Sequence, residues 1–166
     1  MKTERLVLRK WTETDADSLF EYAKNPEVGP VAGWPPHKSV EESKEVIRNV
    51  FNAPECYAIC EKENNIAIGA VELKLNGYTD MTQRDDECEL GYWLGQPFGG
   101  KGYMPEAARE SLRHGFEDLF CFFGAKSFMP GIAPPATAQK YRLATLQYGL
   151  NLRRYFSNSL RSIFLW

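Results

Sequence analysis

One short segment constrains this chain more than any other: a strand pattern, a glycine-rich turn and a helix pattern follow one another between residues 87 and 118. Side-chain character alternates along the first part, as in a strand with two different faces. One face would carry Cys88, Leu90, Tyr92 and Leu94, and the other Glu87, Glu89, Gly91 and Trp93. Positions 99, 100 and 102 are glycines, so the backbone N–H groups of this turn can point toward one place.

The helix pattern runs from Met104 to Asp118, with Pro105 and Glu106 in its first turn. Its predicted apolar stripe consists of Ala108, Leu112, Phe116 and Leu119. A helix N-terminus behind a glycine-rich turn can bind an anion, because its N–H groups are free and the helix dipole favours negative charge. Taken alone this is weak evidence, since a plain strand–turn–helix connection explains it more simply. The Gly-x-x-x-x-Gly-Lys-Ser/Thr loop and the three-glycine dinucleotide fingerprint are both absent.

The complete string of residues is more specific. It reads Glu89-Leu90-Gly91-Tyr92-Trp93-Leu94, followed by Pro97-x-x-Gly100-x-Gly102-Tyr103-Met104-Pro105-Glu106-Ala107-Ala108. This string resembles the acyl-CoA-binding motif of the GNAT acetyltransferases, and most closely the branch that includes ribosomal-protein alanine N-acetyltransferases. The opening residues, Thr3-Glu4-Arg5-Leu6-Val7-Leu8-Arg9 with Trp11, resemble the start of the same branch. The resemblance covers about residues 3–119.

The resemblance implies an α/β fold with a mixed, mostly antiparallel sheet, helices on both sides and a splayed strand that holds acetyl-CoA. The N–H groups of the turn would bind the pyrophosphate, and the end of the strand would meet the pantetheine arm and the thioester. The implied cofactor-binding residues are Trp93, Leu94, Gly99, Gly100, Lys101, Gly102, Tyr103 and Met104. The side chain of Lys101 is expected to point to solvent, and a backbone N–H of Trp93 or Leu94 could stabilise the oxyanion.

Acetyl transfer to an amine also needs a base and a proton donor. Glu89 is the candidate base, because the family often has an acid two residues before this glycine, and Glu87 on the same face is the runner-up. A solvated carboxylate on the strand face is an equally good interpretation of Glu89. Tyr141, or Tyr148, is the candidate proton donor for the leaving thiolate.

Other elements follow from periodicity and turn residues. Strands are predicted at residues 5–9, 56–60 and 67–75. Thr14 and Asp17 have the form of a capping box that opens a helix to about Lys24, and Ser39 is predicted to cap a helix that ends near Phe51. The loop at residues 28–37 is either a substrate wall or a mere connection.

Composition indicates one globular domain over residues 1–166. Charged residues make up 25% and aromatic residues 13% of the chain, and no apolar run is long enough to span a membrane. The charged N-terminal residues do not form a signal peptide pattern, so a cytoplasmic protein is expected. The four cysteines lack a Cys-x-x-Cys pair and are predicted to be core thiols, with no metal site. His37 and His114 are expected to be surface or boundary residues.

The chain changes character after residue 119. All 22 acidic residues precede this point, whereas the rest of the chain has six basic residues and no acid, so the formal charge is −8 before the change and +6 after it. The family's Asn-x-x-Ser motif would fall on Ala138 and Tyr141 and is absent. Residues 120–166 are therefore interpreted as a basic tail that binds nucleic acid or membrane, a divergent second half, or the product of a reading-frame change. The abrupt loss of acidic residues favours the last.

These observations predict an acetyl-CoA-dependent N-acetyltransferase that modifies a primary amine, such as a protein N-terminal α-amine. A small-molecule amine is the alternative acceptor. A catalytically impaired protein that binds acetyl-CoA is a further alternative, because a foreign tail would remove one wall of the cofactor site. No nucleic-acid or membrane partner is expected, and the protein would be a monomer or a homodimer.

Overall fold

The computed structural model describes residues 1–79 and 83–123. Its helices and strands follow in the order β1 (Leu6–Arg9), α1 (Ala16–Ala23), α2 (Val40–Asn49), β2 (Cys56–Glu61), β3 (Ala67–Lys74), β4 (Glu87–Leu94), α3 (Tyr103–Glu117) and β5 (Phe122–Phe123). Short 3-10 turns lie at Glu13–Asp15, Pro30–Ala32 and Gln96–Phe98. The predictions for Ala138, Tyr141 and Tyr148, and for the tail beyond residue 123, lie outside the described residues.

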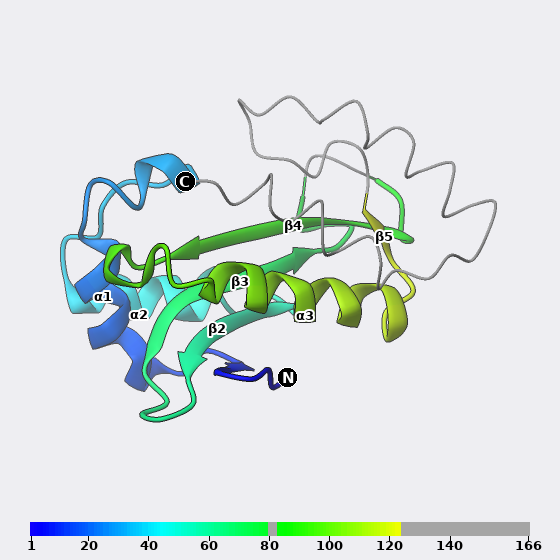
Figure 1. Cartoon of the computed structure of the whole chain (residues 1–166). Coiled ribbons are helices and arrows are strands. Elements are labelled where there is room, and N and C mark those ends of the chain that lie inside the picture. Colours follow the sequence, from blue (N-terminus) through cyan, green and yellow to red (C-terminus); the bar gives the residue numbers. More distant parts are fainter. Residues whose placement is uncertain (80–82, 124–166) are drawn as a thin grey trace.

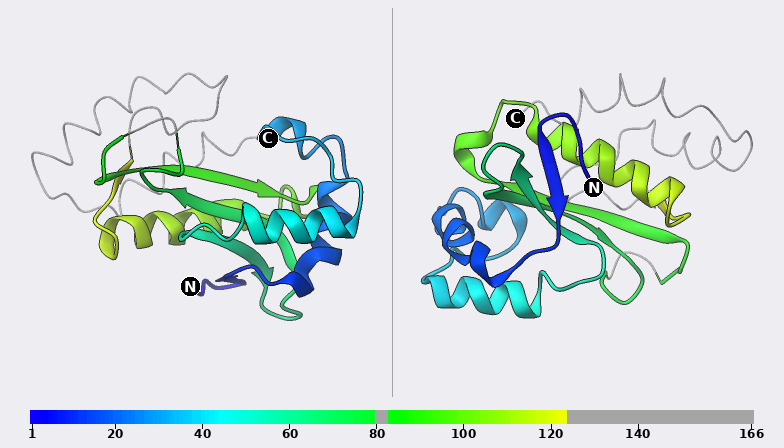
Figure 2. Two further views of the ribbon diagram at one scale, coloured as in Figure 1. Left: turned by 180° about the vertical axis from the view of Figure 1, so that it is seen from behind. Right: turned by 90° about the horizontal axis from the view of Figure 1, so that it is seen from below.

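The strands form one sheet in the order β1-β2-β3-β4-β5. The first four strands are antiparallel, whereas β5 pairs with β4 in parallel. Helices α1 and α2 cover one face of the sheet and α3 covers the other (Figures 1 and 2). The predicted fold class, a mixed and mostly antiparallel sheet between helices, is confirmed.

The alternation predicted for residues 87–94 is present in β4. Trp93 belongs to the apolar cluster beneath α1 and α2, while Leu90, Tyr92 and Leu94 pack into the cluster beneath α3. All four cysteines are buried and none forms a disulfide, as predicted for core thiols. Burial raises the pKa of the Cys56 thiol to about 12, which keeps it protonated. The turn that follows β4 is thus attached to a strand with a fixed orientation.

The predicted apolar stripe of α3 was correct at Ala108 and wrong at its three larger residues. The buried positions of α3 are Met104, Ala107, Ala108, Ser111 and Gly115. Leu112, Phe116 and Leu119 are only half-buried. Small side chains allow the helix backbone to approach the sheet closely, so the largest apolar residues do not mark the inner face. The helix therefore lies tightly on the sheet next to the glycine-rich turn.

The first helix also begins differently from the prediction. The Thr14–Asp17 box does not form; instead Asp15 Oδ2 accepts from the N–H and the hydroxyl of Thr12, each at 2.9 Å. Asp15 takes this capping position because Arg9, at the end of β1, holds its carboxylate with two hydrogen bonds of 2.7 Å. The second cap was correct, since Ser39 Oγ accepts from the N–H of Glu42 at 3.1 Å.

The Arg9–Asp15 pair joins β1 to the start of α1, and its carboxylate is only 8% exposed. Replacement of Asp15 by Asn should lower the free energy of unfolding by about 2 kcal/mol at pH 7, because the Arg9 charge loses its partner. Burial opposes ionisation, but the bonds from Arg9 and Thr12 lower the pKa of Asp15 overall. The difference from wild type in urea unfolding should therefore persist above the ordinary pKa and shrink as the pH falls below about 4. An equal difference at pH 7 and pH 3 would contradict this assignment.

Candidate functional site

The turn between β4 and α3 has a backbone that only glycine adopts without strain. Gly100 and Gly102 have φ angles of +73° and +77°, and they flank Lys101, whose φ is not positive. When left-handed and right-handed backbone conformations alternate along the chain, successive N–H groups turn to the same side. This creates a concavity suited to anions. No atom of residues 1–79 or 83–123 beyond its chain neighbours lies within 4 Å of the position that a Cβ atom would take on Gly100. The predicted phosphate loop thus has suitable geometry.

The N–H groups of residues 100–104 donate to no protein acceptor within the part of the chain that the structure describes. The neighbouring N–H groups are engaged: Gly99 donates to Gln96 O at 3.1 Å and Glu106 donates to Gly102 O at 3.2 Å. Gly99, which was among the predicted cofactor ligands, therefore shapes the turn with its N–H instead of offering it. The available donors begin at Gly100 and continue into the first turn of α3.

Side chains of the turn point to neighbouring protein groups. The ammonium of Lys101 lies 5.2 Å from the centre of the Phe98 ring. The hydroxyl of Tyr103 donates to Glu61 Oε1 at 3.1 Å, and the ring of Tyr103 lies beneath the guanidinium of Arg5. Lys101 is exposed, in agreement with the prediction. The anion-binding capacity of this turn therefore lies in its backbone.

The end of β4 supplies a further N–H group. Gly95 donates to Ile68 O at 2.8 Å, and hydrogen bonds alternate along an antiparallel ladder. We therefore expect the N–H of Trp93 to face β3 and the N–H of Leu94 to face the opposite edge. Within the described residues β5 pairs with β4 at Glu87 and Cys88 alone. Of the two predicted oxyanion donors, Leu94 thus has the better orientation.

Charged side chains gather on the face of β4 that carries Glu89. Glu89 accepts from the hydroxyl of Thr79 at 2.5 Å and lies 3.6 Å from the ammonium of Lys74, its cross-strand neighbour. Gly91 leaves room beside them, because a Cβ atom there would lie 3.2 Å from Lys74 Cε and 3.9 Å from Glu72 Oε2. The side chain of Glu89 is 15% exposed. It is therefore less exposed than expected for the alternative interpretation, a solvated carboxylate on the strand face.

Glu72 is a second carboxylate of this group that sequence reasoning missed. It lies opposite Gly91 in the register of β3 and β4. Burial raises the pKa of Glu72; Lys74 and Lys10 oppose this shift, and the Glu89 carboxylate adds to it. A half-buried acid with a raised pKa beside a second acid is a candidate proton acceptor. Its alternation with Lys74 in the sequence was visible, but its place opposite Gly91 was not.

Comparisons with known proteins identify the family of this chain. Residues 5–146 match the family model described as "Acetyltransferase (GNAT) domain". The chain belongs to the GNAT acetyltransferase family. The uncharacterized N-acetyltransferase p20 of Bacillus licheniformis is 31% identical over 122 residues, an alignment that covers 70% of this chain and 66% of p20.

Solved GNAT structures resemble the chain in fold. A Bacillus anthracis acetyltransferase superposes with a TM-score of 0.61 at 21% identity, covering 73% of this chain and 68% of that protein. A Vibrio cholerae protein assigned as a ribosomal-protein-serine acetyltransferase gives a TM-score of 0.57 at 22% identity, covering 87% of this chain and 79% of that protein. These likenesses concern the fold, and the glycine-rich turn of this GNAT domain precedes α3 as the family motif implies.

Aromatic residues surround Trp93, near the C-terminal end of β4 in this GNAT domain. Trp93 stacks on Trp11 at 6.4 Å between ring centres and meets Trp34 edge-on at 5.8 Å. Trp34 comes from the loop at residues 28–37, so this loop packs against the strand that carries Glu89. The indole N–H groups of Trp11 and Trp93 are buried and have no acceptor among the described residues. This contact brings the loop at residues 28–37 to the candidate site.

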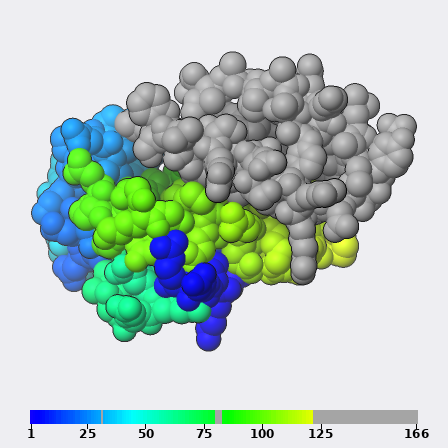
Figure 3. Space-filling model, in the orientation of Figure 1, coloured from blue at the N-terminus to red at the C-terminus, as the bar shows by residue number. Residues whose placement is uncertain are grey.

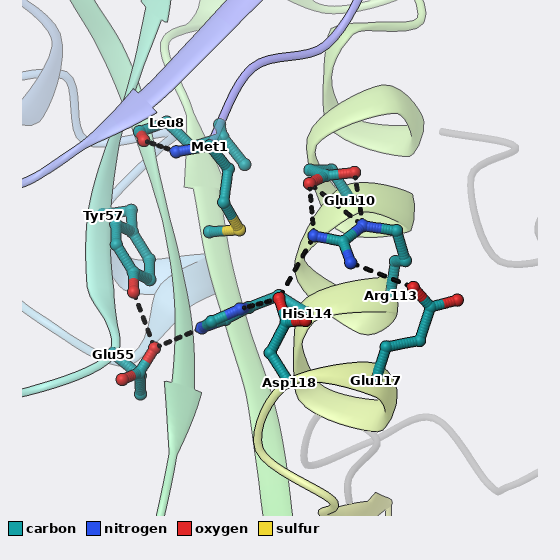
Figure 4. Close-up of polar contacts among 9 residues, drawn as sticks. All are labelled: Met1, Leu8, Glu55, Tyr57, Glu110, Arg113, His114, Glu117 and Asp118. Carbon is teal, nitrogen blue, oxygen red and sulfur yellow. Dashed lines mark hydrogen bonds and ion pairs between the residues drawn. The ribbon is translucent and has the colours of Figure 1, made fainter.

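Both histidines lie outside this site. His37 Nδ1 is 2.8 Å from Ser43 Oγ in the core beneath α2. His114 bridges the C-terminal half of α3 and the start of β2, where its ring nitrogens lie 2.7 Å from Asp118 and 3.0 Å from Glu55, which also accepts from Tyr57 (Figure 4). These contacts fix elements of the fold.

Metal-binding clusters and membrane-spanning helices are both missing from the described residues. No group of three or more His, Cys, Asp and Glu side chains in residues 1–79 and 83–123 could hold a metal ion. No helix in the same part of the chain is long and apolar enough to cross a bilayer.

Proposed function

We propose that the protein transfers an acetyl group from acetyl-CoA to a primary amine. The observation that carries this proposal is the run of available N–H groups at residues 100–104, at the start of α3 and separated from the end of β4 only by a short turn. Such donors fit the pyrophosphate of coenzyme A, because they are fixed in place and aided by the helix dipole. Acetyl-CoA, when bound, would supply the activated thioester.

The residues of β4 would act on the two reacting groups. The N–H of Leu94 would donate to the carbonyl oxygen of the thioester as negative charge develops there. Glu89 would take a proton from the acceptor ammonium, directly or through one water, and the free amine would attack the acetyl carbon. The carbon–sulfur bond then breaks, and the thiolate takes up a proton. Tyr141 stays a prediction for that last donor.

A protein N-terminal α-amine is the proposed acceptor. Two features favour it: the motif of the ribosomal-protein alanine N-acetyltransferase branch, and the fold likeness to a protein assigned as a ribosomal-protein-serine acetyltransferase. The carboxylates of Glu72 and Glu89 would attract any ammonium group, so a small amine is the competing acceptor.

The direct experiment combines binding with turnover. Calorimetric titration of the full chain with acetyl-CoA should give saturable binding with one site. Turnover should then be compared between peptides with a free N-terminal Ala or Ser, polyamines and aminoglycosides. Thiol should be released with the peptides. Preference for a small amine would replace the acceptor proposal. Absence of acetyl-CoA binding would overturn the function.

A catalytically impaired acetyl-CoA-binding protein is the second candidate. The observation that favours it is the change in formal charge from −8 to +6 at residue 119, together with the missing Asn-x-x-Ser motif. Saturable acetyl-CoA binding without thiol release from any amine would support this candidate. The cytoplasmic location and the monomer or homodimer state stay predictions.

Glu72 gives this proposal a pH signature. Its raised pKa means that the folded protein holds the proton more tightly than the unfolded chain, so ionisation lowers stability as the pH rises above the unfolded pKa of about 4.3. Glu72→Gln should therefore raise the melting temperature at pH 7 and have no effect near pH 4. The same substitution should lower kcat/KM and shift its acidic limb if Glu72 assists Glu89. A less stable variant at pH 7 would contradict the burial argument.

A further inference from the structure

Arg5 and Glu106 lie 101 residues apart in sequence and form an ion pair beside the glycine-rich turn. Arg5 Nε donates to Glu106 Oε2 at 2.7 Å, and the Arg5 backbone N–H donates to Glu106 Oε1 at 2.8 Å. The hydroxyl of Thr3 also donates to Oε1, at 2.5 Å. The segment before β1 thus surrounds one carboxylate in the first turn of α3. The N-terminal segment, dark blue in Figure 3, lies against the green surface of this region.

Arg5 also contacts the turn itself. Its Nη1 donates to the carbonyl oxygen of Lys101 at 2.9 Å, and its guanidinium lies 4.6 Å from the centre of the Tyr103 ring. A Cβ atom on Gly102 would lie 3.4 Å from Arg5 Nη2. One guanidinium therefore contacts the carbonyl, the glycine and the ring that define the turn between Gly100 and Met104.

The position of Glu106 gives this pair an electrostatic role. Glu106 is the acidic residue in the first turn of α3, where its negative charge would repel a phosphate bound at the same helix end. Burial opposes ionisation of Glu106, but the hydrogen bonds from Thr3 and Arg5 lower its pKa overall, so the carboxylate is ionised at neutral pH. The adjacent Arg5 charge offsets it, and the helix end stays attractive to anions.

We infer that Arg5 and Glu106 are a positioning pair for the pyrophosphate loop: Arg5 fixes the backbone of residues 101–103 and neutralises the carboxylate beside the phosphate site. The inference rests on the proposed function, because it assigns the loop to coenzyme A. Neither residue contacts the ligand in this scheme. The pair acts through the N–H groups of residues 100–104, and it explains why Thr3 and Arg5 accompany Pro105 and Glu106 in the motif.

A double-mutant cycle tests the pair, with the affinity of the full chain for coenzyme A measured by calorimetry. Arg5→Ala should weaken binding about tenfold, because the loop loses its anchor and Glu106 its counter-charge. Glu106→Gln alone should change affinity less than threefold. The double variant Arg5→Ala/Glu106→Gln should bind several-fold more tightly than Arg5→Ala, because the uncompensated charge has been removed. A merely structural pair would not give this recovery.

Two further variants keep the test decisive. Arg9→Ala breaks a comparable ion pair at the far end of β1, and it should lower the melting temperature while leaving coenzyme A affinity unchanged. If Arg5→Ala does not fold, Arg5→Lys retains the charge but not the planar fork, and it should bind with intermediate affinity. Wild-type affinity in Arg5→Ala or Arg5→Lys, or no recovery in the double variant, would overturn the inference. Failure of the wild type to bind coenzyme A would instead overturn the proposed function.

Discussion

Gly100→Val should weaken coenzyme A binding about 100-fold or abolish it. Gly100 has a φ angle of +73°, which a β-branched residue does not adopt without strain, so the N–H groups around it would turn away from their common point. The empty space beside the Gly100 Cα atom is also where we expect the phosphate to approach. Calorimetric titration with coenzyme A measures the effect.

Gly77→Val is the matched control for this experiment. Gly77 has a φ angle of +87°, and nothing lies within 4 Å of the position that a Cβ atom would take on it, so the substitution imposes similar backbone strain away from the turn. It should reduce stability by about 1–2 kcal/mol and leave coenzyme A affinity unchanged. Equal affinities in Gly100→Val and wild type would remove the phosphate site from residues 100–104.

Glu89→Gln should lower kcat about 100-fold while the affinity for acetyl-CoA stays within a factor of two. The amide keeps the size of the side chain and can still bond the Thr79 hydroxyl, which lies 2.5 Å from the carboxylate. The substitution removes the capacity to accept a proton, together with the charge that faces the Lys74 ammonium. Stopped-flow or steady-state thiol release at pH 7, with a saturating peptide acceptor, gives kcat directly.

Glu87→Gln distinguishes between Glu87 and Glu89, the two candidate bases on the same face of β4. Glu87 lies 3.5 Å from Arg84 and its side chain is 14% exposed, which is similar to Glu89. It lies two residues further than Glu89 from the C-terminal end of β4. The Glu87 variant should retain kcat within a factor of a few. If it loses turnover while Glu89→Gln does not, the runner-up is the base. If neither loses turnover, the base lies elsewhere, at Glu72 or at an ordered water.

Sequence reasoning succeeded where the controlling interactions are local. The alternation from Glu87 to Leu94 determines which side chains lie on each face, and the glycines at 100 and 102 determine the turn, because both features depend on neighbouring residues alone. The start of the first helix was misplaced because Asp15 binds Arg9, a contact between two elements. The inner face of α3 was missed because small residues, which have weak hydrophobic signals, make its closest contacts with the sheet.

The rest of the site depends on contacts between distant segments. Glu72 meets Gly91 through the register of β3 and β4, and a shift of one residue would have moved it to the opposite face. The use of Gly99 N–H by Gln96 O is set by the short turn before it and reduces the predicted donor set by one. The pairing of Arg5 with Glu106 had no signal in the sequence beyond the presence of both residues in the motif.

The attachment of α3 at both of its ends has a consequence for the order of folding. Glu106 near the start of the helix bonds Arg5, 101 residues earlier, while His114 near its end bonds Glu55, 59 residues earlier. Closing a chain segment of this length costs conformational entropy that grows with the logarithm of its length, and contacts at such separations form slowly. The antiparallel hairpin of β2 and β3 can form first, whereas the phosphate loop reaches its final shape only when the opening residues have docked. We therefore expect the proposed cofactor site to be among the last parts of the described fold to assemble, so that coenzyme A binding would report completed folding.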